Sequence, residues 1–197
     1  VLDGNFDSKS IQVGMNQHDT INVDVADVSS SAIGAYVVTG SGQMNGSASA
    51  GTNGLAGNDI TVRGYLGTKT LDVAAGNDAK DVVDLINGSS DEYGVTAKAV
   101  THLKFGDVSN DGTVTLKIGQ NGSSSSLTTV TGTVTTTDLS NLRDAINAVS
   151  GDTGVTASNL DGSNANLLLK DADGNDIVLG DFTNSTTSAT ADVNAYN

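Results

Sequence analysis

The sequence predicts an α+β fold, made mainly of antiparallel strands and hairpins with two short helices, each packed on a small sheet. Three observations support this fold class. Apolar and polar residues alternate with a period of two in many short runs, as in half-buried strands. Only two stretches have apolar residues at helical spacing, and both belong to a segment that occurs twice. Short strands interrupted by only two helices are typical of α+β domains.

The repeated segment covers residues 78–97 and 138–157, which superimpose without a gap at an offset of 60 residues. Ile86-Asn87 aligns with Ile146-Asn147, and Gly-Val-Thr-Ala occupies both 94–97 and 154–157. Each copy has the pattern of a short helix, a glycine turn and the start of a strand. A duplicated scaffold without reactive residues indicates a structural protein rather than an enzyme.

The first part of the chain, residues 1–38, has the pattern of neighbouring strands. Residues 10–14 and 20–25 both alternate, and the polar stretch 15–19 between them resembles a turn, so we expect a hairpin. Residues 39–58 are rich in Gly, Ser and Asn, and this composition predicts a linker or an exposed loop.

The first copy of the repeat follows two short strands, at 60–62 and 70–73, with turns at Gly64 and Gly67. Asn77 or Asp78 is placed to cap the first helix. Apolar residues at helical spacing predict a buried face, comprising Val82, Val83, Leu85 and Ile86. We expect Gly88 to end this helix in the left-handed conformation and residues 95–100 to lead into the next strand.

The second copy is framed by two expected hairpins. One joins 103–105 to 113–118 through Asn110-Asp111-Gly112, and the other joins 167–169 to 177–179 through residues 171–175. Residues 130–134 are a further alternating strand. Thr137 or Asp138 should cap the second helix, Gly151 and Gly154 should close it, and its buried face should comprise Leu139, Leu142, Ala145, Ile146 and Val149. The tail from Asn184 is rich in Thr, Ser and Ala, so we expect it to be loose or only locally ordered.

Composition argues against several classes of partner and site. The formal net charge of -14 disfavours nucleic acid and anionic membrane surfaces. The absence of Cys excludes disulfides and thiolate metal sites within this sequence. No apolar run approaches the roughly 20 residues that span a bilayer. Because the sequence starts at Val1, without Met or a positively charged leader, we expect a processed or trimmed chain.

Oxygen-rich turns are the strongest candidates for a metal site. Asp171, Asp173, Asn175 and Asp176 offer Ca²⁺ ligands, but their spacing departs from the EF-hand pattern, so a polar hairpin tip is the favoured interpretation. The same holds for Asp107, Asn110 and Asp111. His18 and His102 are far apart in sequence, and no nucleophile elbow or phosphate-binding loop is present. We therefore expect no catalytic, cofactor or metal residues, and no enzyme.

Several stretches resemble bacterial flagellin. The stretches that carry the likeness are Val1-Leu2-Asp3-Gly4-Asn5-Phe6, Ile11-Gln12-Val13-Gly14-Met15-Asn16, Asp19-Thr20-Ile21-Asn22-Val23-Asp24-Val25 and Ser31-Ala32-Ile33-Gly34. Ile11 and Met15 stand where the family usually has Phe and Ala. The duplicated unit is similar to the flagellin hook IN motif, which hook-associated and filament-cap proteins share. Flagellins also carry long terminal helices, and no such helices are present in this sequence.

The resemblance implies the variable middle of a flagellin. Residues 1–38 would be a hairpin segment from the edge of the D1 domain, 39–57 a linker or loop, 58–105 and 106–182 two outer modules of the D2 or D2/D3 region, and 183–197 a return segment. The implied function is a secreted structural subunit of the extracellular flagellar filament, used in motility. Its partners would be other flagellin subunits, while this chain alone, without the terminal helices, would be a monomer.

Two alternatives remain open beside the flagellin hypothesis. One is a hook-associated or filament-cap protein. The other is a cell-surface adhesin domain that binds a glycan, suggested by polar loop tips and a β surface rich in Ser and Thr, but disfavoured by an aromatic content of only 4%. The resemblance also implies O-glycosylation, with Ser123 to Ser126 and Thr183 to Thr190 as the expected acceptors.

Overall fold

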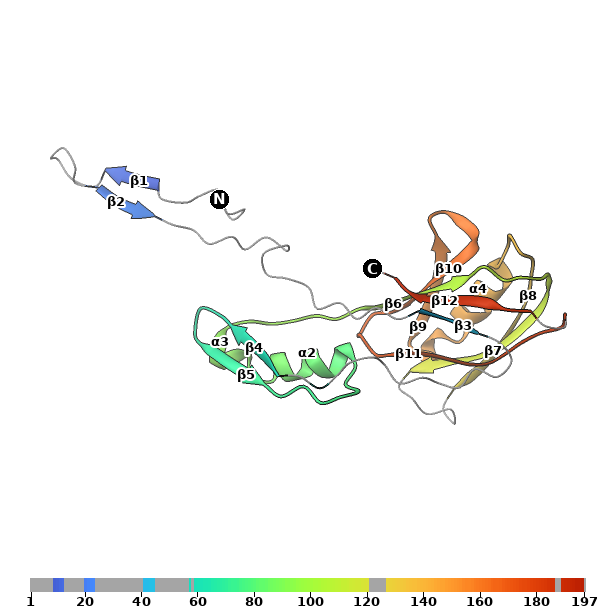
Figure 1. Cartoon of the computed structure of the whole chain (residues 1–197), viewed down its shortest axis with the longest axis horizontal. Coiled ribbons are helices and arrows are strands. Elements are labelled where there is room, and N and C mark those ends of the chain that lie inside the picture. The colour runs from blue at the N-terminus through green and yellow to red at the C-terminus, as the bar shows by residue number, and fades with distance from the viewer. Residues whose placement is uncertain are drawn as a thin grey trace. The chain divides into compact units, whose positions relative to one another are not determined.

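The computed structural model describes residues 9–12, 20–23, 41–44, 57, 59–120, 127–186 and 189–196. The chain divides into two units, Val1–Val37 and Val38–Asn197. In the first unit, strands β1 (Lys9–Gln12) and β2 (Thr20–Val23) pair antiparallel with Ile11 opposite Ile21 (Figure 1). The predicted N-terminal hairpin is therefore confirmed.

The second unit contains two larger antiparallel sheets. The five-stranded sheet has the order β3 (Ser41–Met44), β12 (Ala191–Ala195), β6 (Thr101–Gly106), β10 (Ser163–Asp171) and β9 (Val155–Leu160). The three-stranded sheet has the order β11 (Ile177–Asn184), β7 (Gly112–Gln120) and β8 (Thr128–Val134). Together with the helices, these sheets confirm the predicted α+β class.

Helix α4 (Ser140–Ala148) packs against β8 and β9, the edge strands of the two sheets. Its apolar residues enter one core shared by both sheets, in which Leu139, Leu142 and Ile146 are at most 1% exposed. Ala145 and Val149 are partly buried against that core. The buried face predicted for the second helix is thus confirmed. Because aromatic residues are scarce, Phe105 and Phe182 supply the core's ring contact, with centroids 6.3 Å apart.

The first copy of the repeat forms a smaller assembly. Strands β4 (Ile60–Arg63) and β5 (Thr68–Leu71) form a hairpin, followed by helices α2 (Ala79–Asn87) and α3 (Ser90–Tyr93). Residues 95–100 then run extended toward β6 (Figure 1). No residue of α2 is fully buried, and Leu85 is 37% exposed. The predicted apolar face of this helix is therefore only partly buried: Val82, Val83 and Ile86 are half-buried.

The two internal hairpins predicted around the second copy are wrong. Strand β6 pairs with β10 and β12, whereas β7 pairs with β8 and β11, so residues 107–111 cross from one sheet to the other. Residues 172–176 likewise carry the chain from β10 to β11 in the other sheet. Turn-forming residues specify a chain reversal, but the shared core decides which strands become neighbours.

The expectation of a loose tail is wrong for residues 191–195. They form β12, which lies between β3 and β6 in the five-stranded sheet, with Val193 opposite Phe105. The Thr/Ser/Ala-rich composition of this part of the chain gave no strand signal, although Ala191 of β12 is fully buried. β3, in turn, lies within the Gly/Ser-rich stretch 39–58. Most of that stretch falls outside the described residues, so its interpretation as a linker stays a prediction.

Candidate functional site: two asparagine clamps

Asn87, the last residue of α2, binds the backbone of Ala97 through both ends of its side-chain amide. Its Oδ1 accepts a hydrogen bond from the Ala97 N–H at 2.8 Å, and its Nδ2 donates to the Ala97 carbonyl at 3.1 Å. The helix end is therefore fastened to the extended segment ten residues further on. We call this pair of bonds an asparagine clamp.

Asn147 forms the same clamp in the second copy. Its Oδ1 accepts from the Ala157 N–H at 2.8 Å, and its Nδ2 donates to the Ala157 carbonyl at 2.9 Å. The bonds of Asn147 are partly buried, whereas those of Asn87 are exposed. Residues 60 positions apart thus make identical contacts, and the repeat in sequence is a repeat in hydrogen bonding.

The chemistry of the clamp explains why an asparagine occupies this position. In a strand, the N–H and C=O of one residue point to the same edge. Only an amide side chain offers a donor and an acceptor together at that spacing, since an aspartate carboxylate accepts but cannot donate. The asparagine therefore takes the place of a neighbouring strand at one residue, on the edge that faces the helix.

Each clamp encloses a short second helix that ends in a left-handed glycine. Helices α3 (Ser90–Tyr93) and α5 (Ser150–Thr153) are followed by Gly94, with φ 74°, and Gly154, with φ 68°. Gly88 ends α2 as expected, but the left-handed conformation expected for it was wrong, because Gly88 has φ -62° and the chain continues into α3. Gly151 lies inside α5, so only Gly154 closes the second pair of helices.

The two copies differ at the start of their longer helices. Asp78 caps α2 as predicted and forms a capping box with Asp81. The cap predicted for α4 was misplaced, because Leu139 occupies the cap position and makes no side-chain cap bond. Asp138, one residue earlier, still accepts a bond from the Ser140 N–H at 2.9 Å. Hydrogen bonds from the Ser140 side chain and then its backbone N–H lower the pKa of the Asp138 carboxyl.

The oxygen-rich turn at 171–175 is held by internal bonds. Asp171 is fully buried, and its Oδ1 accepts from the N–H groups of Asp173, at 2.9 Å, and Asn175, at 3.1 Å. Its Oδ2 accepts from Gln120 Nε2. The favoured hairpin tip is therefore a crossover loop that closes around a buried carboxylate.

The remaining predicted candidates are dispersed. Asp107 pairs with Lys104 at 2.7 Å, and Asp111 accepts from the Thr136 N–H at 2.8 Å. His102 lies in β6. Across the ranges that the structure describes, no three His, Asp or Glu side chains are grouped so that they could hold a metal ion. His18 and residues 123–126 lie outside those ranges, so the expectation of no catalytic, cofactor or metal residues stays a prediction.

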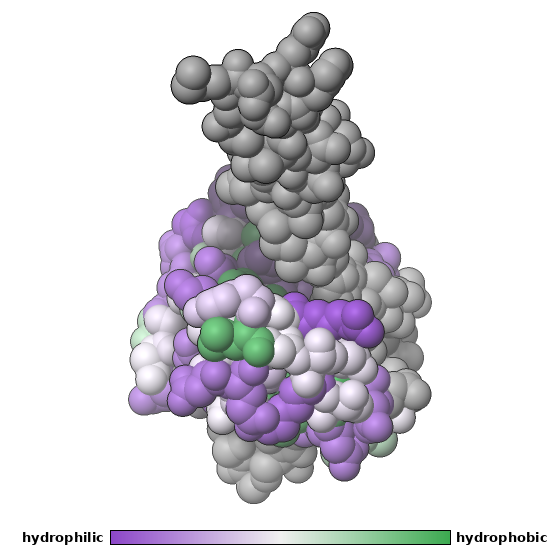
Figure 2. All heavy atoms as spheres, turned by 90° about the vertical axis from the view of Figure 1, so that its left-hand side faces the viewer, coloured by the Kyte–Doolittle hydropathy of each residue, from purple (hydrophilic) through white to green (hydrophobic). Residues whose placement is uncertain are grey.

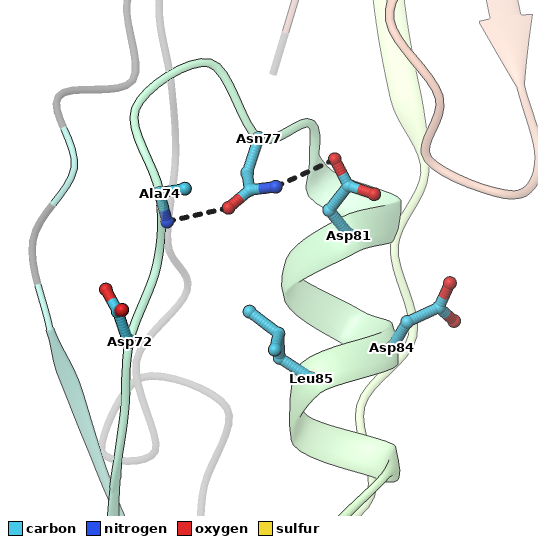
Figure 3. A pocket seen from close by; sticks show the side chains of 6 residues that line it. All are labelled: Asp72, Ala74, Asn77, Asp81, Asp84 and Leu85. Carbon is cyan, nitrogen blue, oxygen red and sulfur yellow. Dashed lines mark hydrogen bonds between the residues drawn. The ribbon is translucent and has the colours of Figure 1, made fainter.

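A shallow pocket of about 480 Å³ lies beside α2 (Figure 3). Its carboxylates Asp81 and Asp84 already have partners: Asn77 Nδ2 donates to Asp81 at 3.0 Å, and Lys80 pairs with Asp84 at 2.5 Å. Leu85 lies between the helix and the segment of Asp72, while Asp84 points to the far side of the helix. Asn77 and Asp81 therefore support the start of α2, and we assign no ligand to this pocket.

Comparison with known families identifies the repeated unit. A family model described as the flagellin hook IN motif matches residues 59–109 and 115–173, more than half of the chain. Each matched segment contains one asparagine clamp. No curated protein matches the chain. Among the described residues, no helix is long and apolar enough to cross a membrane.

Proposed function

Because this chain belongs to the family defined by the flagellin hook IN motif, we propose that it is the solvent-facing middle region of a flagellin. In this proposal the parent protein polymerises into the extracellular flagellar filament and serves motility. The family match supports the flagellar assignment. The duplicated clamp supports a structural role, because its polar side chains bind backbone groups of the same chain.

The proposed division of the chain follows the flagellin resemblance. Residues 1–38 would belong to the edge of the inner domain, 39–57 would connect, 58–105 and 106–182 would form the two outer modules, and 183–197 would return toward the inner domain. The separation of Val1–Val37 from Val38–Asn197 supports a boundary near residue 38. In this proposal the modules face solvent, and the net charge of -14 keeps a crowded filament surface hydrated.

The second candidate is a hook-associated or filament-cap protein, which the family's description as a hook motif favours specifically. Both candidates are structural, and they differ in where the protein resides. A filament subunit is present along the whole filament, whereas a cap or junction protein is confined to one end.

Immunogold electron microscopy of intact flagella separates the two candidates. Antibodies raised against this chain should label the filament along its entire length if the residues face solvent in every subunit. Label confined to the distal tip or to the hook junction would support the second candidate. Intact flagella without label, when the same antibodies recognise depolymerised flagella, would show that the region is not on the surface.

A further inference from the structure

The first copy of the repeat lacks a strand that the second copy has. Residues 95–100 (VTAKAV) correspond to β9, residues 155–160 (VTASNL). Strand β9 pairs antiparallel with β10, with Thr156 opposite Lys170 and Ser158 opposite Leu168. Residues 95–100 have no strand partner among the described residues, and Figure 1 shows this segment extended with no ribbon strand paired to it.

The clamp determines which edge of this segment is open. Asn87 binds both backbone groups of Ala97, so the N–H and C=O groups of Thr96 and Lys98 point to the opposite edge. Within the described part of the chain, neither residue has a backbone hydrogen-bond partner on that edge. The exposure pattern agrees: Val95, Ala97 and Ala99 are half-buried, while the residues between them are exposed. Among the described residues, the segment thus runs as an extended edge with no strand beside it.

Apolar exposure is concentrated in the same module. The large apolar side chains that are exposed among the described residues are Tyr65 at 86%, Leu66 at 56%, Val100 at 47% and Leu85 at 37%. In the second copy, the counterpart of Val100 is Leu160, which is only 7% exposed. Figure 2 shows one face of the molecule, on which a small hydrophobic area lies among hydrophilic residues. Val100 belongs to the segment itself, so a strand added beside residues 95–100 would cover part of its exposed side chain.

We propose that the open edge of residues 95–100 pairs antiparallel with the same edge of a second copy of this chain. The choice of a second copy rests on the proposed function, which brings copies together. With Ala97 opposite Ala97, Thr96 of each copy faces Lys98 of the other. This reproduces the Thr156–Lys170 pair of β9 and β10, and the small residues Val95, Ala97 and Ala99 meet on the inner face. A two-fold contact of this kind closes after two copies and links outer modules in pairs.

The proposed edge-to-edge contact is small and therefore weak. Two residues on each edge form about four backbone hydrogen bonds, and the segment is much shorter than the roughly 20 to 30 residues a side of a standard stable interface. Repulsion between chains of charge -14 and the lysine on the edge further limit pairing. The free chain is therefore monomeric when dilute, and the edges meet where assembly raises their local concentration.

Single-cysteine cross-linking tests the register, because the chain has no native cysteine. In the proposed pair, Ala97 and its counterpart form a non-hydrogen-bonded pair with Cα atoms about 4.5 Å apart, within the range that a disulfide spans. Lys98 residues of the two copies lie diagonally and further apart. In concentrated solution under mild oxidation, Ala97→Cys should dimerise several-fold faster than Lys98→Cys. Random collision predicts the reverse order, because Lys98 is the more exposed residue.

A second variant guards against misfolding. Lys98→Pro in the Ala97→Cys background removes one N–H donor from the open edge and should slow dimerisation, while Lys98→Ser, which keeps the donor, should not. Circular dichroism verifies that each variant is folded. Dimerisation of Lys98→Cys as fast as that of Ala97→Cys, or a folded Lys98→Pro variant without effect, would overturn the proposal. Immunogold labelling is independent of this result, so a failed edge contact leaves the proposed function standing.

Discussion

At the scale of single residues, the two asparagines do what a neighbouring strand does elsewhere in a sheet. Each satisfies one backbone donor and one backbone acceptor next to a helix end, where unpaired groups are costly. The left-handed glycines Gly94 and Gly154 turn the chain so that the alanine reaches its asparagine. The asparagine, the glycine and the alanine of each copy therefore act through backbone geometry, and their role is in the fold.

Replacing the clamp asparagines with aspartate should destabilise the protein. The change removes the donor and places a carboxylate beside a carbonyl oxygen, so Asn147→Asp should lower the free energy of unfolding by about 1–3 kcal/mol. Asn87→Asp should cost less, because its bonds are exposed to water. Urea unfolding followed by circular dichroism measures both, with Asn110→Asp as a control for the added charge. Equal stability of Asn147→Asp and wild type would contradict the clamp.

The glycines of α5 provide a matched pair of substitutions. Gly154 has φ 68°, and a Cβ there would lie 1.9 Å from Gln120 Nε2, whereas a Cβ at Gly151 would meet nothing within 4 Å. Gly154→Ala should cost at least about 1–2 kcal/mol, while Gly151→Ala should be neutral or stabilising by up to about 1 kcal/mol. Thermal unfolding measures the order, and a Gly151→Ala variant less stable than Gly154→Ala would refute this reasoning.

At the scale of elements, the same helix pattern has two different environments. Helix α4 lies across the edge strands β8 and β9 and buries Leu142 fully, whereas α2 has no fully buried residue. The two helices have similar amphipathic patterns, so the pattern alone does not predict their difference in burial. It arises because only α4 has two sheets to cover.

Truncation of one leucine in each helix measures this difference. Leu142→Ala should reduce the free energy of unfolding by about 2–5 kcal/mol, as is usual for a buried leucine. Leu85→Ala should reduce it by less than about 1 kcal/mol, because 37% of Leu85 is exposed. Similar losses in the two variants, measured by urea unfolding, would contradict the difference in burial between α2 and α4.

The start of α4 should give the protein a specific pH dependence. The pKa of Asp138 lies below the ordinary 3.8 because hydrogen bonds from Ser140 favour its charged form. Its contribution to stability is therefore present above the ordinary value and is lost as the pH falls through the lowered one. The difference in urea midpoint between wild type and Asp138→Asn should be largest near neutral pH and should vanish in strong acid. A difference that grows on acidification would contradict this assignment.

At the scale of the whole molecule, local sequence patterns predicted where helices and strands form better than they predicted which strands pair. The alternating runs, the repeat, the Asp78 cap and the buried face of α4 could all be read from sequence, because each depends on nearby residues. The crossovers at 107–111 and 172–176 could not, since turn residues do not encode which sheet receives the next strand. The strand at 191–195 was missed because its pairing is entirely long-range. The two partners of each clamp could have been proposed from the sequence, because the asparagine of Ile-Asn and the alanine of Gly-Val-Thr-Ala recur at the same spacing in both copies.

The central claim is that both copies of the repeat carry an asparagine clamp, but only in the second copy does a further strand pair with the clamped segment. Amide hydrogen exchange, resolved by residue in dilute solution, tests this claim most directly. The amides of Ala97 and Ala157 should both be protected, because each is bound by its asparagine. Thr156 and Ser158 should be protected by β10, whereas Thr96 and Lys98 should exchange at nearly the rate of an unfolded chain. Unprotected amides at Ala97 and Ala157, or equal protection of Thr96 and Thr156, would contradict the account.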